Sequence, residues 1–458
     1  MKIKPGNLAA EFGRYGLAPG GENGTFFQTL DVVVGVKVKE PTSLSFGEGS
    51  PLLLNEEWVP FALSRSADVE GELVFAGYGI TAQEYGYDDY AGLDVKGKIV
   101  LVLRYEPPPK GEKSPFKKPP RYSSHATFVS KAANARNHGA IGMILVDLHP
   151  PRQGEKGLIP IRRTLGQNDA GIVVTQVKRE IVEKRLEEAG ISLRELKERI
   201  DREEKPASVP LPGLKASLRV TLEKITKKTD NVIGLLPGSD PQLKGENIVI
   251  GAHYDHLGLG YFGTLDMSGE GQIHNGADDN ASGTAVVMNL AEKLSHRPQK
   301  LARSIVFVAF TAEELGTHGS RYYVSHPPLP IESTRAMINL DMVGRLKDNR
   351  LTVSGMDTAK EFRELVTTAA QEVATEITAS PRGVRGSDHV HFYNKNIPVL
   401  HFSTGSHNDY HRPTDDWEKL NIDGMVKVSD MVLAIVGKIA GSKEPPTFVR
   451  LSPTPPKS

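Results

Sequence analysis

One stretch constrains this chain more than any other: residues 246–287, which read ENIVIGAHYDHLGLGYFGTLDMSGEGQIHNGADDNASGTAVV. It opens with an apolar run that predicts a buried strand over residues 248–251, breaks at His253 and continues through a glycine-rich loop. It closes on the acidic turn at residues 278–280, whose composition predicts the start of a helix. Imidazole and carboxylate groups thus lie at the edge of an open α/β sheet where ligands bind, and we expect a metal site there.

Composition limits the kind of site and the kind of partner. The chain has 458 residues, enough for two or three domains. Its 56 basic and 56 acidic residues give a net formal charge of zero, so there is no electrostatic case for binding nucleic acid or an anionic membrane surface. No cysteine is present, so any metal must be held by His, Asp and Glu. No apolar run reaches the ~18 residues of a transmembrane span, and we expect no membrane insertion.

The pattern of apolar and polar residues changes along the chain and predicts four segments. Residues 1–67 alternate apolar and polar positions and are expected to form the first part of the domain that carries the metal site. Residues 68–213 are expected to form a self-contained β-rich module with flanking helices, ending in a linker over residues 207–213. Residues 214–441 are expected to form the main part of the metal-site domain, and residues 442–458 a Pro-rich, loosely attached tail.

The segment after residue 214 alternates strand and helix patterns. Residues 304–310, SIVFVAF, are apolar throughout, as in a central strand covered on both faces. A capped helix is expected over residues 281–295 and a closing helix over residues 423–440. The predicted fold class is α/β, with a mixed, mainly parallel sheet, helices on both faces and an inserted β-rich domain.

Residues that can bind metal recur where these strands end. Parallel strands deliver their carboxyl ends to one crevice, so residues far apart in sequence can meet there. The candidates are His253, Asp255, Asp278, Asp279, Glu313, Glu314, Asp341 and His411.

Each of these groups also has an ordinary structural interpretation. A single His at a strand end is more often only hydrogen-bonded, and the segment Asp278-Asp279-Asn280 before a helix is first of all an N-cap. Taken together, however, several carboxylates converging unpaired in one crevice would cost several kcal/mol each. One or two divalent cations would remove that conflict.

The number of ligands favours two ions. Two His with Asp279, Glu314 and Asp341 can give each ion one imidazole and one terminal carboxylate, with one carboxylate shared. Zn²⁺ suits this mixture of nitrogen and oxygen ligands, with Co²⁺ or Mn²⁺ as possible substitutes. Such a pair activates water, and the remaining Glu of the pair at 313–314 is free to move its proton.

The motifs HYDH, GADDNASG, FTAEELGTHGS, NLDM and YHRPTDD, in this order, resemble the co-catalytic dizinc aminopeptidase family, which includes glutamate carboxypeptidase and transferrin receptor relatives. The resemblance implies a zinc exopeptidase fold acting on peptides. It implies that His253, Asp279, Glu314, Asp341 and His411 bind the two zinc ions, with Asp279 as the bridge. It further implies Glu313 as the general base and Asp255 as the carboxylate that orients His253.

The segments GYGITAQEYGYDDYAGLDVKGKIVLVLR and SKAANARNHGAIGMILV, within residues 68–213, resemble the protease-associated insert of that family. In relatives this insert borders the active-site cleft, and a role in substrate access is a hypothesis here.

Two alternatives to an aminopeptidase remain open at this point. A glutamate-carboxypeptidase-like enzyme would need arginines to bind a carboxylate, for which Arg345, Arg382 and Arg385 are candidates. A non-catalytic binding protein on the same fold is disfavoured because every ligand position and Glu313 are filled.

The remaining histidines are interpreted as structural, and Ser387-Asp388-His389 as a segment that lines the pocket. Gly-x-Ser-x-Gly, the nucleophile elbow, is absent, so a Ser/His/Asp triad is unsupported. Tyr410, beside His411, is a candidate for substrate contact.

The chain as written begins without a signal peptide. Residues 7–15 look like the end of an amphipathic helix whose front is missing. A truncated start and the family resemblance together suggest a secreted or periplasmic protein. Oligomeric state is not indicated.

Overall fold

The fold was obtained as a computed structural model, which describes residues 4–109, 114, 116, 122–150, 157–164, 169–380, 384 and 386–451. The chain divides into two compact units. Unit 1 comprises residues 1–32 and 227–454, and unit 2 comprises residues 33–226. The two divisions fall within the long strands β2 (Phe27–Val38) and β12 (Leu222–Leu236).

Unit 1 is built on a nine-stranded sheet with the order β1-β12-β14-β13-β15-β18-β16-β17, to which β2 is added by pairing with β12. The strands β14, β13, β15 and β18 are parallel neighbours, whereas β12 and β16 run antiparallel to the strands beside them in this central group. Their bounds are β1 (Ala18–Pro19), β13 (Asn247–His253), β14 (Ser304–Phe310), β15 (Thr334–Leu340), β16 (Arg350–Ser354), β17 (Glu376–Ala379) and β18 (Val399–Ser403). The sheet is therefore mixed, with a parallel centre.

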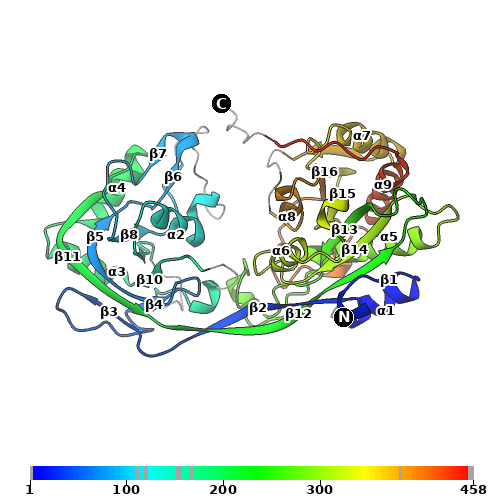
Figure 1. The fold of residues 1–458 in the computed structure, drawn as a ribbon. Helices are drawn as coiled ribbons and strands as arrows, with labels where there is room; N and C mark the ends of the chain where they lie inside the picture. The colour runs from blue at the N-terminus through cyan, green and yellow to red at the C-terminus, as the bar shows by residue number, and fades with distance from the viewer. Residues whose placement is uncertain are drawn as a thin grey trace. The chain divides into compact units, whose positions relative to one another are not determined.

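Helices cover both faces of this sheet, as the alternation of buried side chains shows (Figure 1). In β13, Ile248 and Ile250 pack into the larger core with the helices α5, α7 and α9, whereas Val249 packs into the opposite core with α6 and α8. A strand covered on both faces must be apolar at every position, which explains the continuous run in β14. The helices are α1 (Pro5–Arg14), α5 (Gly283–Ser295), α6 (His318–Ser325), α7 (Phe362–Glu372), α8 (His389–Asn394) and α9 (Ile422–Gly441).

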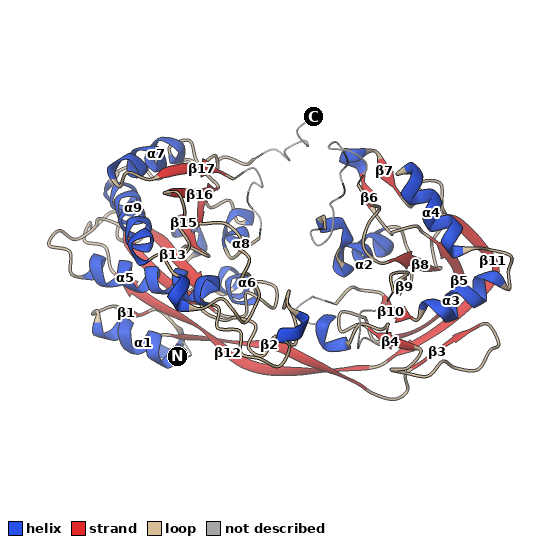
Figure 2. Ribbon diagram, turned by 180° about the vertical axis from the view of Figure 1, so that it is seen from behind, coloured by secondary structure: helices blue, strands red, loops and turns tan. Residues whose placement is uncertain are grey.

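Unit 2 contains a seven-stranded sheet with the order β3-β11-β5-β8-β9-β10-β4. Its centre is parallel from β5 to β10, and its outer pairs are antiparallel. Helices again lie against both faces (Figure 2). The bounds are β3 (Ser43–Phe46), β4 (Trp58–Pro60), β5 (Ala67–Phe75), β6 (Thr81–Ala82), β7 (Tyr87–Asp88), β8 (Ile99–Leu103), α2 (Phe128–Asn137), β9 (Gly142–Val146), β10 (Val173–Val177), α3 (Arg179–Glu187), α4 (Leu193–Glu203) and β11 (Val209–Val220).

The observed unit boundaries differ from the expected domain boundaries. Residues 33–67 lie with unit 2, because β3 pairs with β11 and β4 pairs with β10. Apolar alternation reveals a strand but not the sheet that it joins, so the sequence did not separate this segment from the catalytic part.

Two local predictions are wrong. The expected linker at residues 207–213 is mostly the first part of β11, which pairs with β5 and has an irregularity between Pro210 and Lys215. Its prolines are tolerated because β3 pairs only with Ala216–Arg219, leaving the start of β11 without a partner on that side. The tail is also not loose over its described part, since Val449 donates to the carbonyl of Thr358 at 2.8 Å.

Among the described residues, no helix is both long and apolar enough to cross a membrane.

Candidate metal centre

The carboxyl ends of the parallel strands of unit 1 bring the predicted residues together. His253 is the last residue of β13, and Asp341 directly follows β15. Glu314 lies in the turn after β14, and His411 lies in the loop after β18. Asp279 comes from the turn of residues 277–282 that leads into α5. His253 and His411, which are 158 positions apart in the sequence (411 − 253), therefore meet at one edge of the sheet.

The first group is centred on the imidazole of His253. Its Nε2 lies 3.3 Å from Oδ1 of Asp279 and 3.6 Å from Oδ1 of Asp341. The side chain of His253 is 1% exposed, and these three residues form a group that could hold a metal ion.

The second group is centred on His411 and shares Asp279 with the first. Nε2 of His411 lies 3.2 Å from Oδ2 of Asp279 and 3.1 Å from Oε2 of Glu314. Asp279 thus presents one oxygen to each imidazole. This is the arrangement that a bridging carboxylate requires.

These separations fit tetrahedral zinc. Two ligand atoms bound at 2.0–2.1 Å to one tetrahedral ion lie roughly 3.3 Å apart. The orientations of the two imidazoles also fit metal binding through Nε2. Nδ1 of His411 donates to the carbonyl of Gly263 at 2.8 Å, and Nδ1 of His253 lies 3.1 Å from the carbonyl of Asp255. A carbonyl only accepts, so each Nδ1 carries a proton, and Nε2 is the nitrogen left to face the carboxylate oxygens. Each Nε2 can bind a metal ion there or, without one, hold a proton.

The electrostatics point to the same need. Although burial lowers the pKa of His411, the carboxylates of Asp279 and Glu314 raise it to about 10. Burial likewise opposes the charge on Asp279, but His253 and His411 hold the pKa of this carboxyl well below its ordinary value. Without metal, the site would take up protons on its imidazoles to offset the buried carboxylates.

Buried side chains hold the Asp279 turn in place. Oδ2 of Asp415, which is fully buried, accepts from the backbone N–H of Asp278 at 2.9 Å and of Asp279 at 3.1 Å. The peptide bond between Asp279 and Asn280 is cis. The expected cap of the Asp278-Asp279-Asn280 segment is made by its last residue, since Oδ1 of Asn280 accepts from the N–H of Gly283 at the start of α5 at 3.0 Å.

The carboxylate of Asp255 lies between the imidazole of His253 and the backbone of Glu313 and Glu314. Its carboxylate accepts from the N–H of Glu313 at 3.0 Å and of Glu314 at 3.3 Å, while its Oδ1 lies 3.7 Å from Nδ1 of His253. Ala312, just before, has a φ of 53°, a left-handed conformation that turns the chain after β14. Asp255 therefore holds the Glu313 backbone more closely than it holds the imidazole.

Glu313 does not belong to either metal-binding group. Burial raises the pKa of Glu313 well above its ordinary value, with Asp388 and Asp341 adding to the effect and His253 opposing it. A carboxyl held in this way has the raised proton affinity that a general base requires.

One residue close to the carboxylates was not singled out from the sequence. Nδ1 of His256 lies 2.6 Å from Oε1 of Glu314 and 3.9 Å from Oδ2 of Asp279, and these three residues form a further group compatible with a metal. The ion pairs instead place His411 against the same two carboxylates, at distances closer to those of ligands of one ion. The second His of HYDH was the available signal, which the interpretation of HYDH as a His-x-Asp pair left unused.

The segment Ser387-Asp388-His389 is fully buried. The ring of His389 stacks on His401 at 4.4 Å, and burial lowers the pKa of His389 well below its ordinary value. Ser387 Oγ accepts from Nδ2 of Asn339 at 2.8 Å. The serine thus pairs with an amide, in keeping with the absence of a Ser/His/Asp triad.

Tyr410 and Arg345 also contact the site loops. The ring of Tyr410 stacks on His411 with centroids 3.9 Å apart. Arg345 forms ion pairs with Asp415 at 2.9 Å and Asp409 at 3.4 Å, so its charge is engaged within the protein. The other two arginines considered for a carboxylate pocket, Arg382 and Arg385, lie outside the described residues.

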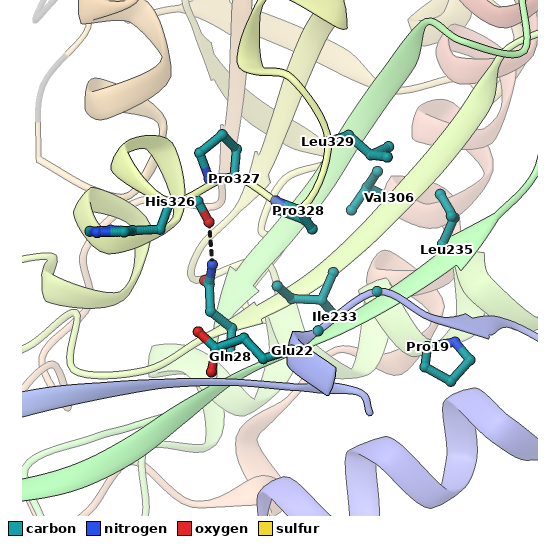
Figure 3. Close-up of a pocket in the computed structure, with 12 residues that line it drawn as sticks. Pro19, Glu22, Gln28, Ile233, Leu235, Val306, His326, Pro327, Pro328 and Leu329 are labelled. Atoms are coloured by element: carbon teal, nitrogen blue, oxygen red, sulfur yellow. Dashed lines mark hydrogen bonds between the residues drawn. The ribbon is translucent and has the colours of Figure 1, made fainter. Parts of the chain in front are cut away.

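A separate cavity of about 360 Å³ lies elsewhere in unit 1 (Figure 3). It is lined by Ile233 and Leu235 of β12, Val306 of β14 and the loop after α6, where Gln28 Nε2 donates to the carbonyl of His326 at 2.6 Å. None of the candidate metal ligands lines this cavity.

Comparisons with known proteins relate two parts of the chain to known families. Residues 231–436 match the sequence profile of peptidase family M28, and residues 69–184 match the PA domain. The part of the chain that holds the candidate metal ligands is thus similar to peptidase family M28, and the inserted part is similar to the PA domain. The metal ligands proposed from the sequence all fall within the family match.

Individual relatives support the family and the fold. The chain is similar to "Aminopeptidase YwaD" of Bacillus subtilis, with 28% identity over 388 residues, covering 81% of this chain and 70% of that protein. In structure it is similar to an aminopeptidase from Aneurinibacillus sp. strain AM-1, with a TM-score of 0.55, 23% identity and coverage of 98% and 90%. It is also similar to BSAP, a zinc aminopeptidase from Bacillus subtilis, with a TM-score of 0.52, 22% identity and coverage of 96% and 88%. At these identities the two structures support the fold alone.

Proposed function

We propose that this protein is an aminopeptidase with two zinc ions held on either side of Asp279 and Glu313 as its general base. The metal-dependent aminopeptidase class follows from the family and its relatives. The pair of ions and the residue roles are our proposal. The observation that carries it is the position of Asp279, whose two oxygens face two different imidazoles at 3.3 and 3.2 Å.

The residues divide into two ligand sets. His253, Asp341 and Oδ1 of Asp279 would hold one ion, and His411, Glu314 and Oδ2 of Asp279 the other. When bound, zinc polarises the scissile carbonyl and lowers the pKa of water at the site.

Glu313 supplies the proton transfer that peptide hydrolysis requires. It takes a proton from the attacking water as the new carbon–oxygen bond forms, and delivers that proton to the leaving nitrogen as the carbon–nitrogen bond breaks. Its backbone N–H is held by the carboxylate of Asp255 at 3.0 Å. Substrates are therefore peptides with a free N-terminus.

Replacing Glu313 tests these roles. Glu313→Gln keeps the size of the side chain and removes its proton affinity, so kcat on aminoacyl-4-nitroanilides should fall by about 10²–10⁴-fold. Zinc content should stay at two per chain, because Glu313 is in neither ligand set. Activity that survives this substitution would refute the role of Glu313, and fewer than two bound ions in the wild-type protein would refute the dizinc centre.

The carboxypeptidase alternative gains no support from the described residues. Arg345 is already paired with two carboxylates and is not positioned as a free cation for a substrate C-terminus.

A further inference from the structure

His256 lies against Glu314 but has no place in the two ligand sets described above. We infer that His256 is a positioning residue that fixes Glu314 for the second metal ion by donating a hydrogen bond from Nδ1 to Oε1. The inference rests on the proposed dizinc centre and assigns a further residue to it. Both side chains are nearly buried, with 8% exposure for His256 and 6% for Glu314.

Distances favour hydrogen bonding over direct ligation. The 2.6 Å between Nδ1 of His256 and Oε1 of Glu314 is a charge-assisted hydrogen bond. It is well below the roughly 3.3 Å that separates two ligands of one tetrahedral zinc. Nδ1 of His256 is also 3.9 Å from Oδ2 of Asp279, whereas Nε2 of His411 is within 3.2 Å of both carboxylates. The ligand position therefore belongs to His411.

The tautomer follows from the surroundings of the ring. Among the described residues, no polar atom pairs with the buried Nε2 of His256. A proton on Nε2 would be a buried donor without an acceptor, whereas a proton on Nδ1 has Oε1 of Glu314 as its acceptor. The Nδ1–H form satisfies Nδ1 and Oε1 of Glu314 and leaves Nε2 only as an unpaired acceptor, so it is the tautomer of lower cost.

The backbone leaves room for this ring at one glycine. A Cβ on Gly276 would lie 2.5 Å from Cγ of His256 and 2.3 Å from the carbonyl oxygen of Asp279. Gly276 also has a φ of 60°, which favours glycine. Any larger residue at the start of the Asp279 turn would therefore clash with the ring of His256.

Glu314 is consequently held at both ends. Its N–H donates to Asp255, its Oε1 accepts from His256, and only Oε2 remains to face Asp279 and His411. Without His256, Oε1 would be released and Glu314 could leave the ligand geometry. Outer partners of metal ligands typically contribute 10–100-fold to metal affinity.

Four variants of the full chain test the inference through zinc binding. Asn at position 256 places its amide nitrogen near the position of Nδ1, whereas Gln places it near that of Nε2. The variants are His256→Asn, His256→Gln, His256→Phe and, as a control, His274→Asn. His274 is a buried histidine of the same loop whose ring nitrogens contact Thr264 and Gln272 and neither carboxylate.

Zinc affinity is measured by equilibrium dialysis against chelator-buffered Zn²⁺ with metal analysis, and folding by circular dichroism. We expect His256→Phe and His256→Gln to keep one tight site and to weaken the second by about 10–100-fold. His256→Asn and His274→Asn should stay within a few-fold of the wild type at both sites.

Each other outcome is decisive. Unchanged affinity in His256→Phe, or equal loss in His256→Asn and His256→Gln, would overturn the hydrogen-bonding role of His256. A wild-type protein that binds only one ion would instead overturn the dizinc centre itself. If His256→Phe fails to fold, the Asn and Gln pair still decides.

Discussion

The two units each bury ionisable side chains, but they satisfy them in different ways. In unit 2, Asp89 and Lys131 are both fully buried. The carboxylate of Asp89 accepts from the N–H groups of Tyr78 and Ile80, each at 3.0 Å, and from the hydroxyl of Tyr87 at 2.9 Å. Lys131 donates to the carbonyl of Tyr78. This cluster contains its own donors and its own cation.

In unit 1, the buried carboxylates outnumber the cations available to them. Asp279, Glu314 and Asp341 meet two imidazoles whose Nδ1 protons are engaged elsewhere. Only a proton on each Nε2, or a metal ion in its place, can then offset these carboxylates. The comparison shows that a buried charge indicates a metal only where the protein's own donors are insufficient.

Removal of the bridge should have the largest effect. Asp279→Asn removes the charge shared by both ligand sets, so both zinc ions should be lost. Activity should fall to background, further than the roughly 10²–10⁴-fold expected for loss of the general base. Zinc content and hydrolysis of an aminoacyl-4-nitroanilide measure this. The matched control is Asp357→Asn, at an exposed carboxylate paired with Arg363, which should change neither.

Removal of the buried carboxylate of unit 2 should affect stability without affecting zinc. Asp89→Ala leaves three donors without an acceptor, so unit 2 should lose about 3–5 kcal/mol. Hydrogen exchange of unit 2 amides in the full chain measures the loss. The control is Asp68→Ala, which breaks an exposed ion pair with Arg219 and should cost under about 1 kcal/mol. Loss of bound zinc in Asp89→Ala would contradict the contrast between the two clusters.

Metal removal should destabilise unit 1 alone. At free zinc of 100 times its Kd, each ion contributes about 2.7 kcal/mol to the folded state, and chelation removes that contribution. Amide exchange should therefore accelerate in β13, β14 and β15 but not in β5, β8 or β9. Equal acceleration in both units would mean that zinc stabilises the whole chain and would argue against a site confined to unit 1.

The stability of the two units should also depend on pH in opposite directions, through one buried side chain in each unit. Burial raises the pKa of Asp89 to about 7, so its contribution to stability is present at low pH and is lost as the pH rises through 7. Burial, with Arg321 and His318, lowers the pKa of His391 to about 4, so its contribution is present above pH 6.5 and is lost as the pH falls through 4.

Two difference measurements isolate these contributions. The stability difference between wild type and Asp89→Asn should fall between pH 4 and 7, measured on unit 2 amides. The difference between wild type and His391→Gln should rise over the same interval, measured on unit 1 amides. The same sign in both units would show that the pKa shifts are misassigned.

The sequence predicted the parts of the site that follow from strand ends. His253 and Asp341 end or follow strands that are mostly buried, and parallel neighbours bring such positions together. The same reasoning could not identify His256, because its role depends on the side-chain geometry of Glu314. It also missed Asp415, whose contact with the Asp279 turn spans 136 residues and leaves no local pattern.

The fold class could also be predicted from the apolar pattern of single strands. Which sheet each strand joins could not be predicted in this way. The continuous apolar strand β14 indicated a sheet covered on both faces, and the structure has helices on both. The prolines of β11 suggested a linker, because the sequence alone does not show that β3 leaves their side of the strand free. Local patterns therefore predicted elements well and their distant partners poorly.

The most direct test is a crystal of the purified protein measured above and below the zinc absorption edge. The account predicts two anomalous peaks that appear only above the edge, one on each side of Asp279 and about 3.5–4 Å apart, as in other two-metal sites. One peak should lie against His253 and Asp341, and the other against His411 and Glu314. A single peak, peaks away from Asp279, or no peak in catalytically active crystals would contradict the dizinc centre.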